Sequence, residues 1–494
     1  MTLSEHKKLV GSILLMITLA FSVVSVSSSL QPSSIISSAG TISYWPRVDI
    51  TVNVSKVIGV NNLSLGFMLD FEWKSWLDRS VLRELAQNAS FKLVRVFDFR
   101  KTTPRLAPCV YWNESSMSGT WDWAYVNLLV QRIFEVGAEP LFCLGWARDN
   151  IQNYIPPGMA VNPSTGLPYP ESWAAYCREW VKHFKETGML VRFYETMNEP
   201  WAYFGWNDYD KIRSFMEVFN AAANAMRAED PNVMVSFDGT NRKPVLDYWL
   251  ANGGADLGFV SFHKYDEGEI EYYSDEQMLD RAETFQLKTS TSYYGIQDAR
   301  EIYYNSRKKW IPVINSESNF NSAWETGTDP RIQQMVGSVW LALVLRTGIL
   351  EGLSYNVYFH FASSASWERA NKPSGGVGFG MMNLDNNRPW YPYYTQQLVS
   401  NNLKVGDFLI ESASSSSDVR VISWLNEGKP KILVICKVDQ PREVYFQGLE
   451  EKLAFTKIDV SVPWENATLQ FGEVNTSSPL TLPGYAVALL SIVD

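Results

Sequence analysis

The sequence predicts an α/β protein with a (β/α)8 barrel followed by a C-terminal β-sandwich domain. Between residues 65 and 359, short apolar segments alternate with amphipathic segments of helical length, and eight apolar segments have strand character. After residue 402 the pattern changes to alternating strand-like segments, which is typical of a β-sandwich. The 494 residues also exceed what one hydrophobic core usually serves, so we expect two domains.

The predicted barrel covers residues 61–403. Its strands are expected at 65–71, 93–97, 139–144, 192–197, 233–237, 257–263, 311–316 and 352–359. Helices are expected at 81–89, 123–136, 170–186, 209–229, 245–252, 292–309 and 331–347, and residues 391–402 form the closing helix. An open doubly wound sheet gives a similar alternation, but it usually carries a glycine-rich phosphate turn after its first strand, which this sequence lacks.

The predicted sandwich covers residues 404–494, with strands expected at 419–425, 431–437 and 486–492. Residues 41–60 precede the barrel and contain Ile50, Val52 and Val54 at alternating positions. Alternation of this kind is typical of a strand with one buried face. We therefore predict that this segment joins the C-terminal sheet.

The first 40 residues have the composition of an export segment. The basic residues His6, Lys7 and Lys8 precede an uncharged apolar run over residues 9–26, and a serine-rich leader follows. Such a run fits either a cleaved signal peptide or a retained membrane anchor, and the sequence leaves both open. We expect a secreted or cell-surface protein, with membrane attachment through residues 9–26 in the second case.

Composition excludes some partners and favours others. The net charge of -10 and the pI near 5.2 argue against a nucleic-acid partner, because phosphate binding needs a basic field. Aromatic residues make up 14% of the chain, with 19 tryptophans, and their flat apolar faces stack well on sugar rings. The sequence has no phosphate loop and no metal-ligand spacing, so we expect neither a cofactor nor a metal.

Two glutamates follow predicted barrel strands and are the candidate catalytic residues. Glu199 ends the segment of the fourth strand, within Asn198-Glu199-Pro200, and Glu317 ends the segment of the seventh. Active sites of such barrels lie at the carboxyl ends of the strands, so both acids are expected in one mouth. Asn198 supplies an amide that can bind a sugar hydroxyl beside the scissile bond.

Paired carboxyl groups are the chemistry of glycoside hydrolysis. One protonates the leaving oxygen, and the other attacks the sugar or activates water. A separation of about 5–5.5 Å gives a covalent intermediate and retained configuration. Glu195 is a competing acid on the fourth strand, but its apolar neighbours favour a buried structural partner.

The Glu-x-x-Asn-Glu-Pro run, the Phe259–Tyr265 segment and Ser316-Glu317 resemble retaining glycoside hydrolases with an Asn-Glu-Pro acid/base motif, and most of all glycoside hydrolase family 39. The resemblance runs from about residue 65 to the end of the chain. It implies that Arg95 holds the charge of the nucleophile and that His263 and Tyr265 lie beside the nucleophile and the sugar. Two positions depart from the family pattern: Met197 replaces an aromatic residue, and Trp201 replaces a common asparagine.

The sequence thus predicts a retaining β-glycosidase with Glu199 as acid/base and Glu317 as nucleophile, acting on β-linked xylan- or glucan-type carbohydrate. Tryptophans near strand ends are the expected sugar platforms: Trp146, Trp201, Trp206, Trp324 and Trp367. A catalytically inactive carbohydrate-binding protein of the same fold and an inverting hydrolase are the alternatives. The sugar, exo or endo action and the oligomeric state are left open.

Overall fold

The computed structural model describes residues 45–97, 106–147, 151–270, 272–284, 292–449 and 452–493. The predicted signal or anchor over residues 9–26 and the serine-rich leader lie outside this part of the chain. Within it, no helix combines the length and apolar character needed to cross a membrane.

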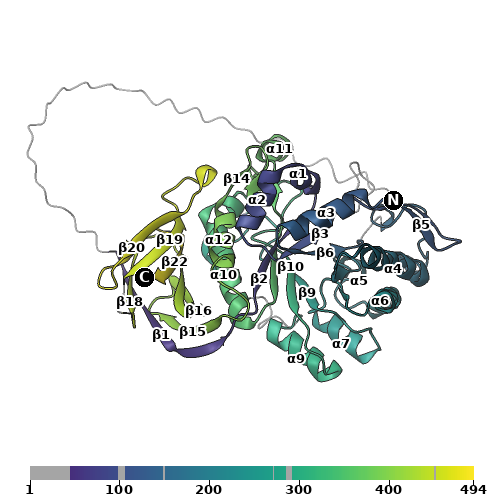
Figure 1. Ribbon diagram of the computed structural model, residues 1–494, viewed down its shortest axis with the longest axis horizontal. Helices are drawn as coiled ribbons and strands as arrows, with labels where there is room; N and C mark the ends of the chain where they lie inside the picture. Colours follow the sequence, from purple (N-terminus) through teal and green to yellow (C-terminus); the bar gives the residue numbers. More distant parts are fainter. Residues whose placement is uncertain are drawn as a thin grey trace, which may run out of the picture. The chain divides into compact units, whose positions relative to one another are not determined.

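Eight parallel strands form the predicted barrel (Figure 1). The strands follow one another around the ring in chain order, and the last strand, β11, pairs with the first, β2, to give the order β8-β7-β6-β3-β2-β11-β10-β9. An isolated parallel bridge between Asp238 and Ser261 connects the two ends of this order. The strands are β2 (Ser64–Leu69), β3 (Leu93–Val96), β6 (Glu139–Cys143), β7 (Phe193–Glu195), β8 (Met234–Ser236), β9 (Val260–Tyr265), β10 (Val313–Asn319) and β11 (Tyr355–Tyr358). The predicted fold class is therefore confirmed.

Helices connect the strands and surround the ring (Figure 1). They are α1 (Trp73–Asp78), α2 (Ser80–Asn88), α3 (Ala124–Glu135), α4 (Pro170–Thr187), α5 (Trp201–Phe204), α6 (Tyr209–Glu229), α7 (Lys243–Ala251), α8 (Asp275–Ala282), α9 (Ile296–Arg307), α10 (Met335–Glu351), α11 (Ala365–Asn371) and α12 (Tyr391–Ser400). Helix α4 begins at a proline and ends before Gly188, whose φ of 73° lets the chain turn away. Helix α10 is apolar around its circumference because almost all of its side chains are buried.

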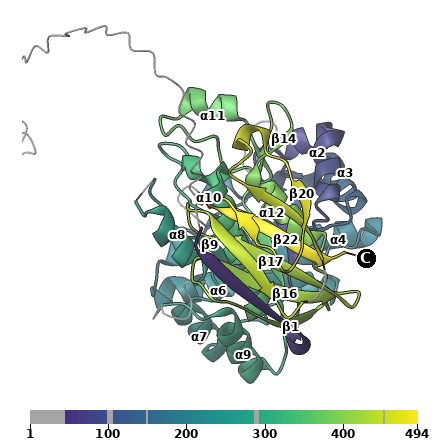
Figure 2. The same ribbon diagram turned by 90° about the vertical axis from the view of Figure 1, so that its left-hand side faces the viewer.

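The C-terminal domain is a single sheet of nine strands folded over its own core (Figure 2). Its strands are β1 (Arg47–Val60), β15 (Phe408–Ser414), β16 (Val419–Asn426), β17 (Lys429–Cys436), β18 (Arg442–Gln447), β19 (Leu453–Asp459), β20 (Gln470–Val474), β21 (Leu480–Leu482) and β22 (Ala486–Ile492). Apolar side chains from every one of these strands meet in one buried cluster. A flat sheet could not bring them together, so the sheet closes on itself as the layers of a sandwich do.

Strand β1 lies inside this sheet, third from the β21 edge, although it precedes the barrel in sequence. It pairs antiparallel with β15 and parallel with β18. Val48, Ile50 and Val52 point into the sandwich core, whereas Val54 is exposed. The first part of the strand alternates as its sequence suggests, and the register shifts after Asn53 mark where the alternation ends.

Short elements complete the rim of the barrel. A hairpin of β4 (Cys109–Asn113) and β5 (Ser118–Trp121) follows β3, and a small sheet of β12 (Ala362–Ser363), β13 (Met382–Asn383) and β14 (Arg388–Pro389) follows β11. Both insertions lie in connections that follow barrel strands at their carboxyl ends, and the one after β11 contributes Ala362 and Ser363 to the wall of the cavity there.

Candidate active site

A cavity of about 1310 Å³ opens where the barrel strands end. Its lining includes residues at or just after the end of every barrel strand: Asp70, Phe97, Trp146, Glu199, Asp238, His263, Glu317 and His360. This is the position at which barrels of this type carry their chemistry. The five predicted tryptophan platforms also line it: Trp146, Trp201, Trp206, Trp324 and Trp367.

Glu199 lies in the turn between β7 and α5. Its backbone has a φ of 41°, a left-handed conformation that is uncommon for a residue with a side chain. The turn is fixed on both sides, since the Asn198 N–H donates to the Gly145 carbonyl at 2.7 Å and the Ala202 N–H donates to the Glu199 carbonyl at 2.9 Å. The side chain projects into the cavity, and its Oε1 lies 3.2 Å from Nδ1 of His263.

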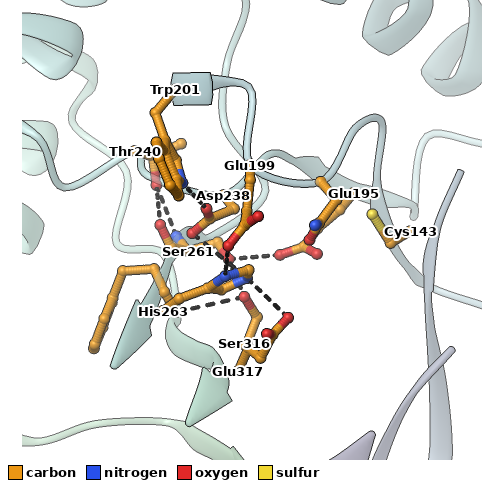
Figure 3. A network of polar contacts seen from close by, with 12 residues as sticks. Cys143, Glu195, Glu199, Trp201, Asp238, Thr240, Ser261, His263, Ser316 and Glu317 are labelled. Carbon is orange, nitrogen blue, oxygen red and sulfur yellow. Dashed lines mark hydrogen bonds and ion pairs between the residues drawn. The ribbon is translucent and has the colours of Figure 1, made fainter. Parts of the chain in front are cut away.

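Glu317 reaches the same point from β10. The register between β10 and β9 shifts after Asn315, and this irregularity pairs Glu317 with His263. Its carboxylate accepts hydrogen bonds from Nη1 of Arg95 at 2.9 Å and from the Tyr265 hydroxyl. Figure 3 shows Glu199 and Glu317 approaching His263 from opposite sides.

Arg95 is fully buried beneath the two glutamates and binds three acceptors. Its Nε donates to Glu195 at 2.8 Å and its Nη2 donates to Asn198 Oδ1 at 2.7 Å, in addition to the bond with Glu317. Burial alone would lower the pKa of Arg95, but the charges of Glu195 and Glu317 outweigh it and raise the pKa. Arg95 therefore stays charged and holds the two carboxylates and Asn198 in fixed positions.

Glu195 is fully buried and does not line the cavity. The sequence interpretation had treated it as a buried structural partner. Its other oxygen accepts a hydrogen bond from the Ser261 hydroxyl at 2.5 Å. Burial would raise the pKa of Glu195, but the neighbouring Arg95 charge lowers it, so the group stays ionised. Its place in the structure is beneath the site, as the counter-charge of Arg95.

His263 contacts both candidate catalytic acids, whereas the resemblance placed it only near the nucleophile and the sugar. Its Nε2 lies 3.6 Å from Glu317 Oε2 and 3.7 Å from Asp238 Oδ1. Burial would lower the pKa of His263, but the charges of Asp238 and Glu317 and the bond to Glu199 raise it to about 9. At neutral pH the imidazole is therefore a cation, and its Nδ1–H donates to Glu199.

Asp238 is a site residue that the sequence interpretation missed. It directly follows the predicted fifth strand, as Glu199 and Glu317 follow theirs, and this position was the available signal. Its Oδ2 accepts a hydrogen bond from the Trp201 indole at 3.1 Å. Burial raises the pKa of Asp238 to about 6, against the opposing effect of His263.

A second buried pair on the cavity wall was also missed. His360 Nδ1 lies 2.7 Å from Glu72 Oε1, and both residues line the cavity. Glu72 and His360 follow β2 and β11, which are adjacent strands, so the pair occupies the wall formed by the first and last strands of the barrel.

Glu199, His263 and Glu317 each offer one ligand atom, and these atoms lie within 4.8 Å of one another. A cation could use such donors only if the imidazole were neutral. With a pKa of about 9, His263 carries a proton on each nitrogen at neutral pH. Without a bound ion, the trio forms a hydrogen-bonded proton network in which His263 donates to Glu199.

No protein-family model matches the chain, and no curated protein matches it by sequence. Solved structures with a similar fold include a glycoside hydrolase family 39 β-xylosidase from Caulobacter crescentus, with a TM-score of 0.60, 15% identity, and coverage of 90% of this chain and 100% of that one. A family 30 endoxylanase from Clostridium papyrosolvens matches with a TM-score of 0.55 and 13% identity. A family 51 α-L-arabinofuranosidase from Thermotoga petrophila matches with a TM-score of 0.59 and 12% identity. Each match covers 90% of this chain and 100% of the other. The chain shares the fold of these glycoside hydrolases across both of its domains, as the resemblance to family 39 implied.

Proposed function

We propose that the protein is a retaining β-glycosidase that hydrolyses O-glycosidic bonds of β-linked carbohydrate, with Glu199 as acid/base and Glu317 as nucleophile. The observation that carries this proposal is the approach of the two acids. One carboxylate oxygen of Glu199 and one of Glu317 lie within 4.8 Å of each other, although β7 and β10 stand on different sides of the ring.

This separation supports a double displacement. Retaining glycosidases hold their carboxyl groups about 5–5.5 Å apart, whereas inverting enzymes leave about 6.5–9.5 Å for a water molecule. One oxygen of each acid lies within 4.8 Å of the other, and this close approach favours the first class.

The partners of each acid fit its proposed role. Glu317 accepts from Arg95 and Tyr265, and both donors stabilise the ionised form that a nucleophile needs. In the proposed acid role, Glu199 keeps the hydrogen bond from His263 at Oε1 and carries the transferable proton on Oε2.

In the first step, a Glu317 oxygen attacks the anomeric carbon while the bond to the leaving oxygen breaks, and the Glu199 proton passes to that oxygen. In the second step, Glu199 takes a proton from water, whose oxygen attacks the anomeric carbon. The bond to Glu317 breaks, and both carboxyl groups return to their starting states. Each reaction consumes one water molecule and requires no other reactant.

A xylan- or glucan-type substrate is the class that we propose. The aromatic side chains of the cavity lining suit stacking on neutral sugar rings. The solved structures of similar fold include a β-xylosidase and an endoxylanase. We also propose that the protein is secreted or attached to the cell surface, because its basic and then apolar first residues have the composition of an export segment.

The first test is a screen of aryl β-xylosides, β-glucosides and plant polysaccharides with protein that lacks residues 1–40. We expect hydrolysis of at least one aryl glycoside and a loss of kcat of about 10³-fold or more in Glu317→Gln, because the nucleophile is removed. Glu427→Gln, at an exposed turn residue, is the matched control. Binding without hydrolysis in the unmodified protein would instead identify a non-catalytic carbohydrate-binding protein.

A second test addresses stereochemistry. Proton NMR of the first product should show retained anomeric configuration, and mass spectrometry after a 2-deoxy-2-fluoro glycoside should show the sugar on Glu317. An inverted first product would exclude the double displacement.

A further inference from the structure

Arg242 is a buried cation in the wall of the cavity that the mechanism above does not use. It immediately precedes α7 and is only 7% exposed, and it lines the same cavity as Glu199 and Glu317. Among the residues that the structure describes, its side chain has no hydrogen bond and no ion pair. A guanidinium group presents several N–H donors and normally finds carboxylate partners when it is buried.

Aromatic rings contact the Arg242 guanidinium, and Asp238 and Glu199 act on it through their charge without a hydrogen bond or ion pair. Its guanidinium carbon lies 4.3 Å from the ring centre of Trp206, 4.8 Å from that of Trp201 and 5.4 Å from that of Tyr293. The rings orient the planar group by cation–π contact but satisfy none of its hydrogen bonds.

The other buried arginine of the site shows the contrast. Arg95 has its donors taken by Glu195, Asn198 and Glu317. Burial lowers the pKa of Arg242, and the charges of Asp238 and Glu199 counteract this only in part. Arg242 therefore lies in a place where an added anion would be bound favourably.

The position of Arg242 identifies the part of the substrate that it would meet. Trp201, on which it stacks, follows Glu199 by two residues and donates to Asp238. An acid/base residue lies beside the leaving oxygen, so the group attached to that oxygen extends along the Glu199 wall. Arg242 and its aromatic neighbours form part of this wall.

We propose that Arg242 binds a carboxylate on the leaving-group side of the substrate, so that the enzyme prefers glycosides whose leaving group is acidic. This inference rests on the proposed glycosidase function. A planar guanidinium matches a carboxylate through two parallel hydrogen bonds, and Trp201 and Trp206 supply flat faces for the ring that carries it. The acid is a uronic acid or an aromatic acid, which share this chemistry. The net charge of -10 disfavours polyanions, so one buried cation selects one anionic group rather than a charged chain.

The test compares a matched pair of substrates, the 4-carboxyphenyl and 4-carbamoylphenyl β-glycosides of the sugar identified in the screen. We expect kcat/KM for the carboxylate to exceed that for the amide in the unmodified protein, and Arg242→Gln to reduce this ratio by about 10- to 100-fold. The ratio for Arg242→Lys should lie between these two values, because lysine keeps the positive charge but lacks the planar guanidinium. Lys372→Gln, which removes another cation of the cavity lining, should leave the ratio within about twofold.

A binding arm separates this inference from the proposed function. In the Glu317→Gln background, 4-hydroxybenzoate should bind about tenfold more tightly than 4-hydroxybenzamide, and only while Arg242 is present. Methyl β-glucuronide compared with methyl β-glucoside then tells a uronic acid from an aromatic acid. Hydrolysis of the neutral glycoside without any Arg242-dependent preference for a carboxylate would overturn the inference and leave the glycosidase in place. Carboxylate binding without hydrolysis would support the inference and reject the function. Circular dichroism and thermal melting confirm that each variant is folded.

Discussion

His263 is in contact with every acid that matters to the proposed reaction. Its two ring nitrogens face Glu199 on one side and Glu317 and Asp238 on the other. As a cation it counterbalances the negative charge of Glu317 beside it, and that of Glu199 once Glu199 has given up its proton, while the charge of Asp238 supports the raised His263 pKa. Asp238 thus acts as a positioning residue, through His263.

This arrangement predicts a shifted histidine titration. The chain has four histidines, so their ring resonances can be assigned one by one. In the unmodified protein His263 should titrate near its pKa of about 9, and Asp238→Asn should lower that pKa because the stabilising negative charge is gone. NMR of ring-labelled protein measures both values. An unchanged His263 pKa in the variant would contradict this role for Asp238.

The same pair predicts a dependence of stability on pH. The pKa of His263 rises from 6.5 in the unfolded chain to about 9 in the folded protein, so the folded state binds the proton more tightly. The stabilisation is fully present below pH 6.5 and is lost as the pH rises through 9. Urea denaturation between pH 6.5 and 9 should therefore show a smaller loss of the free energy of unfolding in Asp238→Asn than in the unmodified protein.

Replacing Arg95 should lower the stability of the fold as well as the activity. Arg95→Met leaves Glu195 buried without its partner, which should lower the free energy of unfolding by about 3–5 kcal/mol. Adding Glu195→Gln should recover part of this loss. Arg192→Met breaks only the exposed pair with Glu139 and should cost less than about 1 kcal/mol. Equal costs for both arginines would show that the buried network contributes little.

Sequence reasoning located Glu199 and Glu317 because strand ends and a short motif are visible in the chain. It could not locate Asp238 or Arg242 as site residues, since nothing in a single sequence tells which polar residue after a strand turns inward. Their importance depends on contacts with His263 and with Trp206, which come from other segments.

At the scale of elements, each carboxyl end of a barrel strand contributes one part of the cavity. All eight strands were predicted to within a few residues, because buried parallel strands form apolar runs between amphipathic helices. Helices α1, α5, α8 and α11 were not predicted. They are short insertions in rim connections, and their sequences have no long apolar period.

The turn between β7 and α5 stores backbone strain at Glu199, whose φ is 41°. Glu199→Gly and Glu199→Ala both remove the carboxyl group, but only glycine adopts this conformation freely. We expect the glycine variant to have the higher free energy of unfolding by about 1 kcal/mol, against the usual order of these two residues. Thermal or urea unfolding of the two inactive proteins measures the difference. A more stable alanine variant would show that the turn relaxes when the side chain is lost.

At the scale of the whole molecule, the barrel and the C-terminal sheet pack together through a shared apolar cluster, in addition to the core that the sheet encloses. Leu409, Trp424 and Leu433 of the sheet belong to the same apolar cluster as the barrel interior. Helix α10 contributes Arg346, whose Nε donates to the Val421 carbonyl at 2.9 Å. The sequence showed that two domains were present, but their shared core depends on long-range packing that periodicity does not encode. The alternation of apolar residues over positions 49–54 nonetheless indicated a strand outside the barrel.

Strand β1 should therefore be critical to the stability of the sheet that it completes. Ile50 is fully buried in the sandwich core, and Ile50→Ala should lower the free energy of unfolding by about 2–5 kcal/mol. Val54→Ala, in the same strand but exposed, should cost less than about 1 kcal/mol. Chemical denaturation of the two variants gives the comparison. A small cost at Ile50 would mean that the packing of β1 contributes little to the stability of the sheet.

The place of β1 also bears on how the protein is made. Its partners β15 and β18 begin at residues 408 and 442, so roughly 350 residues separate the strand from its first neighbour. At a synthesis rate of about 5–20 residues per second, β1 waits roughly 20–70 s after translation before a partner exists. During that interval its apolar stripe and unpaired amides are available to other nascent chains. Production of this protein should therefore depend on chaperones that cover the first strand until translation ends.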